Sequence, residues 1–244
     1  MDKALVEKGG NATTDSAKES KVPVLSAKQV KTALRCEYQY YLEYVLRQKP
    51  PLPSEALSKG LEAHESASRP FSDDLSPEAL LKEAEENQVF RYVYHHLPKK
   101  ETPKIEPKIY AEMGSYRRVI IPDFLYTNQV YDLKTTSSLG AMRSLYSDDV
   151  IQLHYYWDTL GRSHEPYVIK LLLPNPESGR VGYVSSLFRV NISEDIVSLI
   201  RRTEVRILDI LDGSKPVASP GKTCKFCGFR ETCPYSAHKS KEGF

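Results

Sequence analysis

The stretch VIIPDFLYTNQVYDLKTT, residues 119–136, carries the pattern that decides the fold. Residues 119–126 are rich in β-branched and aromatic side chains, so they predict a strand, in which Pro122 indicates an edge position or a bulge. Residues 127–128 fit a tight turn, and residues 129–133 predict a second strand that runs back along the first. The stretch therefore predicts a β-hairpin.

Three charged side chains of this hairpin are predicted to share one site. Strand residues two apart project to the same face, so Asp132 and Lys134 point together. Asp123, on the preceding strand, can face the same site. Two carboxylates and one ammonium suit a divalent metal and an activated water. The same residues would also fit a solvated strand with an ion pair, because an Asp-x-Lys spacing is common by chance.

Length and composition fit one globular domain with an accessory segment. The chain has 244 residues and a formal net charge of +2, which is too small to indicate nucleic-acid binding by itself, so any basic surface must be local. No apolar run is long enough to cross a bilayer. The N-terminus lacks the layout of a signal peptide, so we expect a cytoplasmic protein without membrane contact.

Hydrophobic periodicity and capping residues, among them a capping box of Ser26 and Gln29, predict an α/β domain. Residues 1–22 read as a disordered tail, residues 23–215 as the folded domain and residues 216–244 as a cysteine-containing segment. Helices are predicted over residues 27–46, 54–68, 77–96, 147–161 and 193–212, and strands over residues 104–113, 116–126, 129–133, 166–173 and 181–190. The first three strands would form a meander. The last helix is expected to bury Ile196, Leu199, Ile200, Val205, Leu208 and Leu211.

The four cysteines call for a common explanation. Cys224, Cys227 and Cys233 form a C-x2-C-x5-C pattern in the C-terminal segment, whereas Cys36 lies on the first predicted helix. A reducing compartment disfavours structural disulfides. Four thiolates can ligate zinc or a 4Fe–4S cluster, and either would tie the tail to the N-terminal helix. The three-plus-one spacing favours iron–sulfur over zinc, and free thiols are the third alternative.

Taken in order, the motifs resemble the RecB-type branch of the PD-(D/E)xK nucleases, and the cysteine frame is similar to its iron–sulfur subgroup, most of all to the CRISPR-associated RecB-like exonucleases. The resemblance covers residues 26–235. Three departures concern Asp132 where Glu is commoner, Pro122 before Asp123, and Glu37 after Cys36. The matching positions are Gly60-x-x-x-His64, Asp123, Asp132-x-Lys134 and Gln152-x-x-x-Tyr156.

The resemblance implies a restriction-endonuclease-like mixed sheet of four or five strands, flanked by helices, with a cysteine-ligated cluster lobe. It implies that Mg²⁺ or Mn²⁺ would be held by His64, Asp123, Asp132 and the backbone carbonyl of Leu133. Lys134 would orient or help to deprotonate the attacking water. Gln152 and Tyr156 would position the DNA or the lysine; their alternative role is packing of a helix on the sheet.

The implied function is a metal-dependent DNA exonuclease that acts mainly on single-stranded DNA or DNA ends and carries a structural 4Fe–4S cluster. Its setting would be CRISPR adaptation with integrase partners, or other DNA processing, and an oligomer is left open. Two alternatives are a non-catalytic DNA-binding or assembly module with this fold and a zinc-stapled, nuclease-like protein. Candidate phosphate contacts are Arg117, Arg118, Lys170 and Arg180.

Overall fold

Two β-sheets form the frame of the computed structural model, which describes residues 22–49 and 55–237. The predicted disordered tail, apart from residue 22, lies outside the described residues. The larger sheet has the order β2-β5-β6-β7-β8, in which only β6 and β7 run parallel. Its strands are β2 (Lys104–Ile105), β5 (Phe124–Leu125), β6 (Gln129–Thr136), β7 (Glu165–Leu172) and β8 (Val184–Arg189). The smaller sheet has the order β1-β4-β3, with β1 (Val24–Ser26), β3 (Ile109–Glu112) and β4 (Arg117–Ile120).

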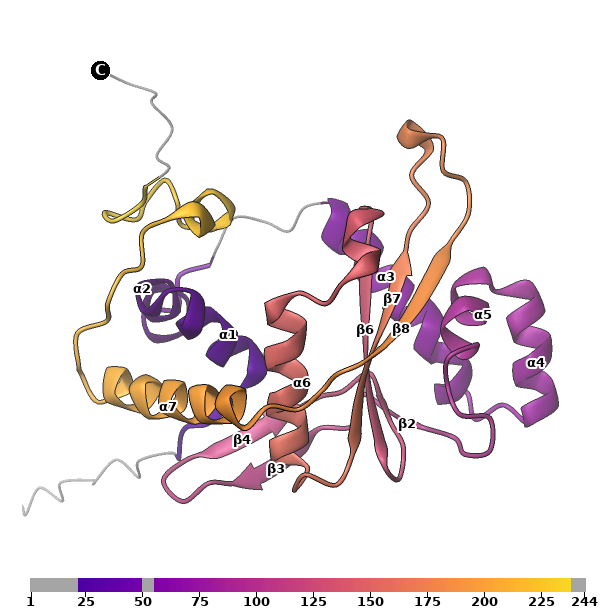
Figure 1. The fold of residues 1–244 in the computed structure, drawn as a ribbon, viewed down its shortest axis with the longest axis horizontal. Coiled ribbons are helices and arrows are strands. Elements are labelled where there is room, and N and C mark those ends of the chain that lie inside the picture. The colour runs from indigo at the N-terminus through magenta and orange to yellow at the C-terminus, as the bar shows by residue number, and fades with distance from the viewer. Residues whose placement is uncertain (1–21, 50–54, 238–244) are drawn as a thin grey trace, which may run out of the picture.

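Helices cover both faces of the larger sheet, so the predicted mixed α/β architecture is confirmed (Figure 1). On one side lie α3 (Glu55–Ser72), α4 (Pro77–Glu86) and α5 (Gln88–Tyr94). On the other side lie α1 (Ala27–Arg35), α6 (Ser147–Thr159) and α7 (Glu194–Leu211). None of the helices in the described ranges is long and apolar enough to cross a membrane.

The alternation of side chains along β6 assigns its residues to these two layers. Val130 belongs to the hydrophobic core beneath α1 and α6, whereas Tyr131 and Leu133 belong to the core beneath α3 and α5. Because side chains alternate along a strand, Asp132 and Lys134 project toward the layer of α1 and α6. The charged side chains of the hairpin therefore emerge under these two helices.

The prediction of one continuous strand over residues 119–126 is wrong, because the strand is interrupted at residues 121–123. Proline has no amide hydrogen for a ladder bond, and Pro122 separates β4 from β5. β4 then pairs with β1 and β3, while β5 pairs with β6 through Phe124 and Tyr131. The expected meander is thus divided between the two sheets, and Asp123 lies at the junction.

Two predicted helices are also interrupted. The predicted capping box is confirmed at the start of α1, where the Ser26 amide donates to Gln29 Oε1 at 2.8 Å. At Cys36 the backbone becomes extended, with φ −167° and ψ 115°, and a short helix α2 (Glu37–Tyr40) and a π-helical turn (Tyr41–Val45) follow. Asn87 likewise ends α4 and caps α5 by accepting a hydrogen bond from the Phe90 amide at 3.0 Å.

The buried face of α7 differs from the predicted one. Ile200 is buried as expected, but Leu199, Val205 and Leu211 are exposed. The buried positions are Val197, Ile200, Thr203, Glu204, Ile207 and Ile210. The face is rotated because Glu204 points inward to meet a buried cation, a pairing that hydrophobic periodicity cannot reveal.

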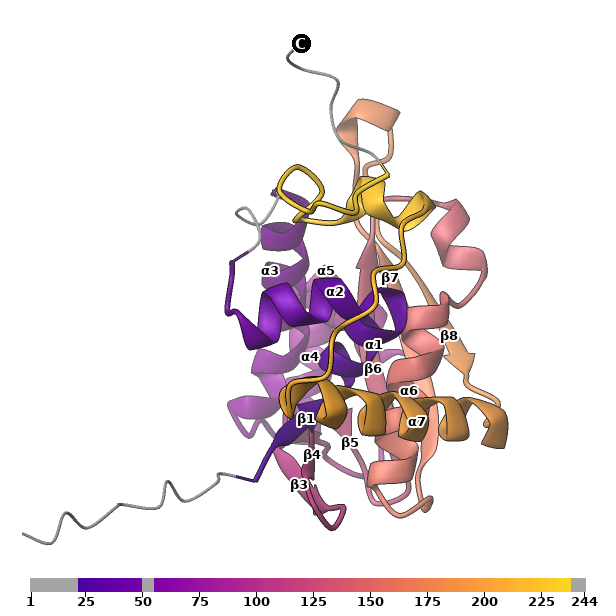
Figure 2. The ribbon, with the colours of Figure 1, turned by 90° about the vertical axis from the view of Figure 1, so that its left-hand side faces the viewer.

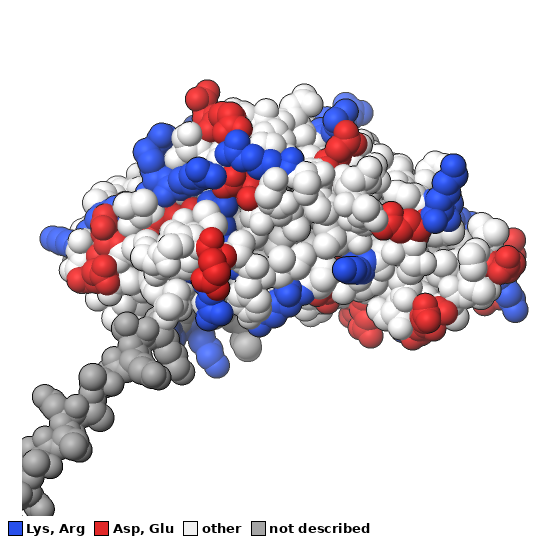
Figure 3. Space-filling view, turned by 90° about the horizontal axis from the view of Figure 1, so that it is seen from below, with Lys and Arg blue, Asp and Glu red and all other residues white. Residues whose placement is uncertain are grey.

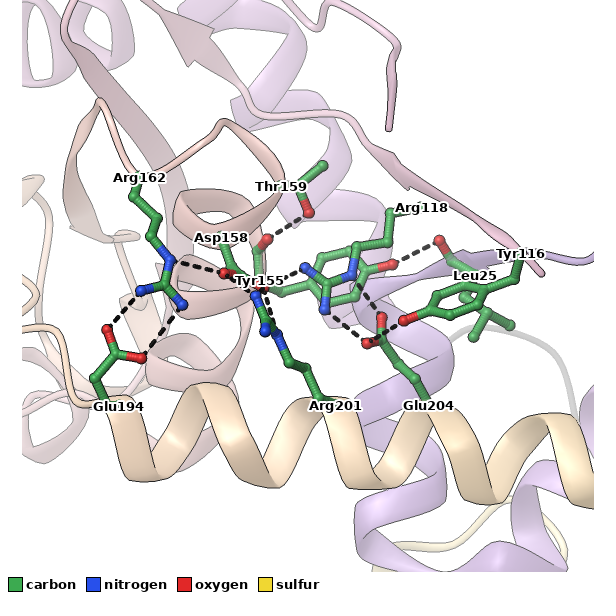
Figure 4. Close-up of polar contacts among 10 residues, drawn as sticks. All are labelled: Leu25, Tyr116, Arg118, Tyr155, Asp158, Thr159, Arg162, Glu194, Arg201 and Glu204. Carbon is green, nitrogen blue, oxygen red and sulfur yellow. Dashed lines mark hydrogen bonds and ion pairs between the residues drawn. The ribbon is translucent and has the colours of Figure 1, made fainter. Parts of the chain in front are cut away.

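That cation is Arg118, which lies at the centre of a buried network (Figure 4). Its guanidinium donates to both carboxylate oxygens of Glu204 at 2.7 and 2.6 Å and to Asp158 Oδ2 at 2.7 Å. Tyr116 adds a hydrogen bond to Glu204 at 2.8 Å. The network joins β4, α6 and α7, so the expectation that Arg118 contacts phosphate is wrong.

Removing Glu204 should unfold the protein at a much lower temperature. The variant Glu204→Ala leaves a buried guanidinium without its main partner, a change that typically costs about 3–5 kcal/mol. For a chain of this size the melting temperature should fall by roughly 6–20 °C. The control is Glu194→Ala, which breaks the exposed pair with Arg162 at the rim of the same network and should cost at most about 1 kcal/mol. Equal shifts in scanning calorimetry would contradict a dominant buried pair.

Candidate active site

Asp132 and Lys134 lie side by side on β6, within the parallel ladder with β7. Asp132 is buried, with 3% of the residue exposed, and its Oδ2 lies 2.6 Å from Lys134 Nζ. The period of the strand sets this neighbourhood, since both side chains leave the same face. Burial raises the pKa of Asp132, although the Lys134 ammonium opposes this. Burial alone would lower the pKa of Lys134, but the Asp132 charge outweighs it and raises that pKa.

Asp123 reaches the same strand from the break between β4 and β5. Its Oδ2 accepts a hydrogen bond from the Leu133 amide at 2.5 Å, in place of the strand partner that is missing there. The N–H and C=O of a strand residue point to the same edge, so the Leu133 carbonyl also faces the Asp123 side. The structure thus places both carboxylates and this carbonyl around one segment of β6.

His64 arrives from α3, on the other layer. Its Nδ1 lies 3.2 Å from Asp123 Oδ1. Gly60, one turn earlier, permits the close approach of this helix, because a Cβ there would lie 3.0 Å from Thr135 Oγ1 of β6. Burial lowers the pKa of His64, but the hydrogen bond and charge of Asp123 outweigh burial, so the pKa is raised overall.

Gln152 of α6 connects the two charged groups of β6. Its Nε2 donates to Asp132 Oδ1 at 2.6 Å, and its Oε1 accepts from Lys134 Nζ at 3.2 Å. The same Nε2 lies 2.8 Å from the Tyr156 hydroxyl, which donates to the carbonyl of Ile121, between β4 and β5. Gln152 therefore connects Asp132 with Lys134, while the buried Tyr156 side chain links α6 to the segment between β4 and β5.

A second lysine, which the sequence did not single out, also reaches this group. Lys31 of α1 donates from Nζ to Gln152 Oε1 at 2.6 Å. In the sequence it sits between the buried residues Val30 and Thr32 on an amphipathic helix. Nothing in that pattern separates it from an ordinary surface lysine.

The donor atoms suit a divalent cation, and one of them has spare capacity. Asp132 Oδ2 is buried and accepts no hydrogen bond from the described residues, despite the nearby ammonium of Lys134. Two carboxylates, an imidazole and a carbonyl are ligands for Mg²⁺ or Mn²⁺. However, no group of three or more His, Cys, Asp or Glu side chains in residues 22–49 and 55–237 is already arranged to hold one ion. His64 and Asp123 contact each other instead.

The four cysteines, remote in sequence, come together in space. All four are free thiols and line one cavity, whose lining also includes Leu42 and Phe229. The amide of Ser219 donates to Cys36 Sγ at 3.5 Å, and the amide of Gly221 donates to Cys224 Sγ at 3.4 Å. Figure 2 shows the C-terminal segment running from α7 across α2 toward the end of α3.

Contacts around α2 fix this segment in place. The Glu37 carboxylate accepts hydrogen bonds from Arg206 at 3.0 Å and from the Val217 amide at 2.8 Å. The Tyr38 amide donates to the Val217 carbonyl at 3.2 Å, and the Tyr38 ring meets that of Tyr235 edge-on. Glu37, which stands where the resembled family has proline, therefore has a docking role of its own.

Of the other expected phosphate contacts, Lys170 is also wrong. Its buried ammonium donates to the carbonyls of Ala141 and Ser144 at 3.0 and 2.6 Å and lies 3.3 Å from Asp149 Oδ2. Lys170 thus fastens the loop after β6 to the sheet. Figure 3 shows one face on which Lys and Arg alternate with Asp and Glu, without a continuous basic area, in keeping with the small net charge.

Arg180 is partly buried and is engaged with the backbone. Its Nη2 donates to the carbonyl of Ser137 at 2.8 Å and to that of Leu173 at 2.9 Å. Arg117 is partly exposed, 3.9 Å from Glu112, with its guanidinium near the Tyr110 ring. Neither is brought to the Asp132 site by a contact among the described residues.

Comparisons with known proteins agree with the fold, and part of the chain matches the model of a nuclease superfamily. Residues 24–119 match the model of the PD-(D/E)XK nuclease superfamily; this segment contains Cys36, Gly60 and His64 but ends before Asp123. The "Putative exonuclease" from Eubacterium rectale is similar in structure, with a TM-score of 0.55 and 13% identity over 93% of this chain and 92% of that chain.

A second structure is the alkaline exonuclease of Laribacter hongkongensis, with a TM-score of 0.48 and 10% identity over 78% of this chain and 89% of that chain. The sequence has no significant match among curated proteins. At these identities the structural likeness concerns the fold.

Proposed function

We propose that the protein is a metal-dependent DNA nuclease of the PD-(D/E)xK superfamily that acts as an exonuclease, mainly on single-stranded DNA or DNA ends. One observation carries the proposal. Asp132 and Lys134 are joined through Gln152, beside Asp123 and His64, just past the point where the pairing of β6 with β5 ends at Tyr131. These residue types at one point suit phosphodiester hydrolysis.

In this proposal His64, Asp123, Asp132 and the Leu133 carbonyl hold Mg²⁺ or Mn²⁺. Bound there, the ion would supply charge stabilisation for the scissile phosphate and would lower the pKa of a water. Asp132 offers Oδ2, the buried oxygen that faces the Lys134 ammonium at 2.6 Å, for binding. An imidazole among the ligands shifts the preference toward Mn²⁺ relative to an all-oxygen site.

The remaining residues act on the water and the phosphate. Lys134, kept protonated by Asp132, orients the attacking water and offsets negative charge on the phosphate. Gln152 keeps the Lys134 ammonium and the Asp132 carboxylate in register through its two amide atoms. Tyr156 donates to the carbonyl of Ile121 and so fixes α6, and with it Gln152, to the segment between β4 and β5. Positioning of this kind is a large part of what a protein contributes to phosphoryl-transfer chemistry.

We further propose that Cys36, Cys224, Cys227 and Cys233 ligate a structural 4Fe–4S cluster, with zinc as the alternative. The support is that all four line one cavity and that backbone amides donate to two of the sulfurs. Zinc requires four sulfurs about 2.3 Å from one point. The three-plus-one spacing of the cysteines favours the iron–sulfur cluster. A role in CRISPR adaptation beside integrase proteins rests on the family resemblance alone.

The proposal predicts metal-dependent degradation of end-labelled single-stranded DNA by anaerobically purified protein. Cleavage should occur with Mn²⁺ and Mg²⁺ and should stop with EDTA, and a circular strand should resist an exonuclease. His64→Asp should lower the ratio of Mn²⁺-supported to Mg²⁺-supported activity by roughly tenfold, because it replaces the nitrogen ligand with oxygen. Cleavage that survives EDTA would contradict the metal mechanism. A folded wild type that binds DNA but never cleaves it would favour the binding-module alternative.

A further inference from the structure

Lys31 is a partly buried cation without a carboxylate partner. Its Nζ donates to the neutral Gln152 amide, and no Asp or Glu oxygen among the described residues lies within ion-pair distance. Taking an ammonium out of water without an opposite charge is costly. Neighbouring cations are all paired: Lys134 with Asp132, Arg35 with Asp148, and Lys170 with Asp149.

The surroundings of Lys31 favour the arrival of an anion. Burial lowers its pKa, and the nearby Lys134 ammonium lowers it further, which the charges of Asp132, Asp148 and Asp149 offset only in part. Gln152 Oε1 lies 2.6 Å from Lys31 Nζ and 3.2 Å from Lys134 Nζ. The two ammonium groups therefore lie close together, on one shared oxygen. An anionic oxygen would stabilise both cations better than the shared amide oxygen does.

The position of Lys31 indicates which anion this is. Asp123 and His64 approach β6 from the edge at β5 and from α3, whereas Lys31 approaches from α1, on the far side of Gln152. Arg35, one turn further along α1, leads from there toward Cys36 and the cysteine-lined cavity. A strand whose scissile phosphate lies at Asp132 and Lys134 would therefore present a neighbouring phosphate to Lys31.

We propose that Lys31 is a phosphate-binding residue that contacts the backbone phosphate next to the scissile one, on the side of the strand that leads toward the cysteine lobe. This inference rests on the proposed nuclease function. On binding, Lys31 exchanges Gln152 Oε1 for a phosphate oxygen, and Gln152 keeps its contacts with Asp132 and Lys134. Lys31 thereby sets the register of the DNA strand over the reacting groups.

The test compares Lys31→Met, Lys31→Arg and the control Lys28→Met. Lys28 lies on the same helix, is 75% exposed and pairs with Glu43. Lys31→Met should raise KM for single-stranded DNA about tenfold with little change in kcat, as expected for one charge-assisted contact. It should also reduce the salt slope of binding by about 0.7, the value for one phosphate contact on a single strand. Lys31→Arg should recover most of the affinity, and Lys28→Met should behave as wild type.

Oligonucleotides with one neutral methylphosphonate at each position then identify the phosphate. Neutralising the phosphate next to the cut should weaken wild type about tenfold and leave Lys31→Met unaffected. An unchanged salt slope, or a Lys31→Met penalty that persists at every position, would overturn the inference while the nuclease proposal stands. A wild type that fails to cleave with any metal would overturn both. Circular dichroism melting of each variant separates loss of binding from loss of fold.

Discussion

Replacing Asp132 with asparagine is expected to lower kcat/KM for DNA hydrolysis about a thousandfold, since a metal site supplies several kcal/mol of charge stabilisation and about 4 kcal/mol corresponds to that factor. Asparagine keeps the shape of the side chain and can still meet Gln152. What it loses is the negative charge on Oδ2, the buried oxygen that lies 2.6 Å from Lys134 Nζ. It also loses the charge that keeps Lys134 protonated.

The same substitution should leave the fold intact. Burial raises the pKa of Asp132, which means that the fold disfavours the charge that function requires. Lys134, left without its carboxylate, has a side chain about one-third exposed and can be solvated. Metal-free Asp132→Asn should therefore melt at or slightly above the wild-type temperature. A site residue that lowers stability is common where activity needs a buried charge.

Glu165→Gln is the matched control for this experiment. Glu165 begins β7, the neighbour of β6, where it is in register with Gln129, and forms an exposed pair with Arg189 at 2.6 Å. Its activity should equal that of wild type. Initial rates on end-labelled single-stranded DNA with Mn²⁺ measure both variants. If Asp132→Asn kept more than a tenth of an EDTA-sensitive activity, the hydrolytic site would have to lie elsewhere.

Local signals in the sequence were reliable where short-range geometry decides the outcome. The period of a strand brought Asp132 and Lys134 to one face, and the hydroxyl and amide of Ser26 and Gln29 identified the start of α1. The glycine of the Gly60-x-x-x-His64 motif is explained by the close approach of α3 to Thr135 of β6. Each of these rests on residues no more than a few positions apart or on the absence of a side chain.

Features set by tertiary contacts could not be predicted in this way. The strand is interrupted at Pro122, and β4 belongs to a separate sheet because β1 supplies it with a parallel partner. The buried face of α7 includes Glu204 only because Arg118 enters the core from β4. Lys31 joins the site through Gln152, 121 residues away. A single sequence holds no pattern that marks such pairs, since charged residues are ordinarily exposed.

The interruption of the first helix at Cys36 has a consequence for stability. The extended backbone there turns the thiol toward the cavity that Cys224, Cys227 and Cys233 also line. A cluster at this point would close a loop of roughly 190 residues. A cross-link that closes such a loop lowers the entropy of the unfolded chain and so raises the free energy of unfolding by about 5 kcal/mol. Cys36→Ser should therefore lose the iron, the brown colour and absorbance near 400 nm that iron–sulfur proteins show, and melt about 10–20 °C lower.

The control for Cys36→Ser is Thr223→Ala, which lines the same cavity beside Cys224 and should keep both iron and melting temperature. Iron and zinc content, absorbance and thermal unfolding are measured on anaerobically purified protein. A colourless wild type with one zinc per chain would favour the zinc alternative, and a Cys36→Ser variant with full iron would remove Cys36 from the ligand set. Because Lys31 lies little more than one turn before Cys36 on α1, loss of the cluster should also raise KM for DNA at temperatures where the variant is folded. An unchanged KM would mean that the cysteine lobe and the phosphate contact are independent.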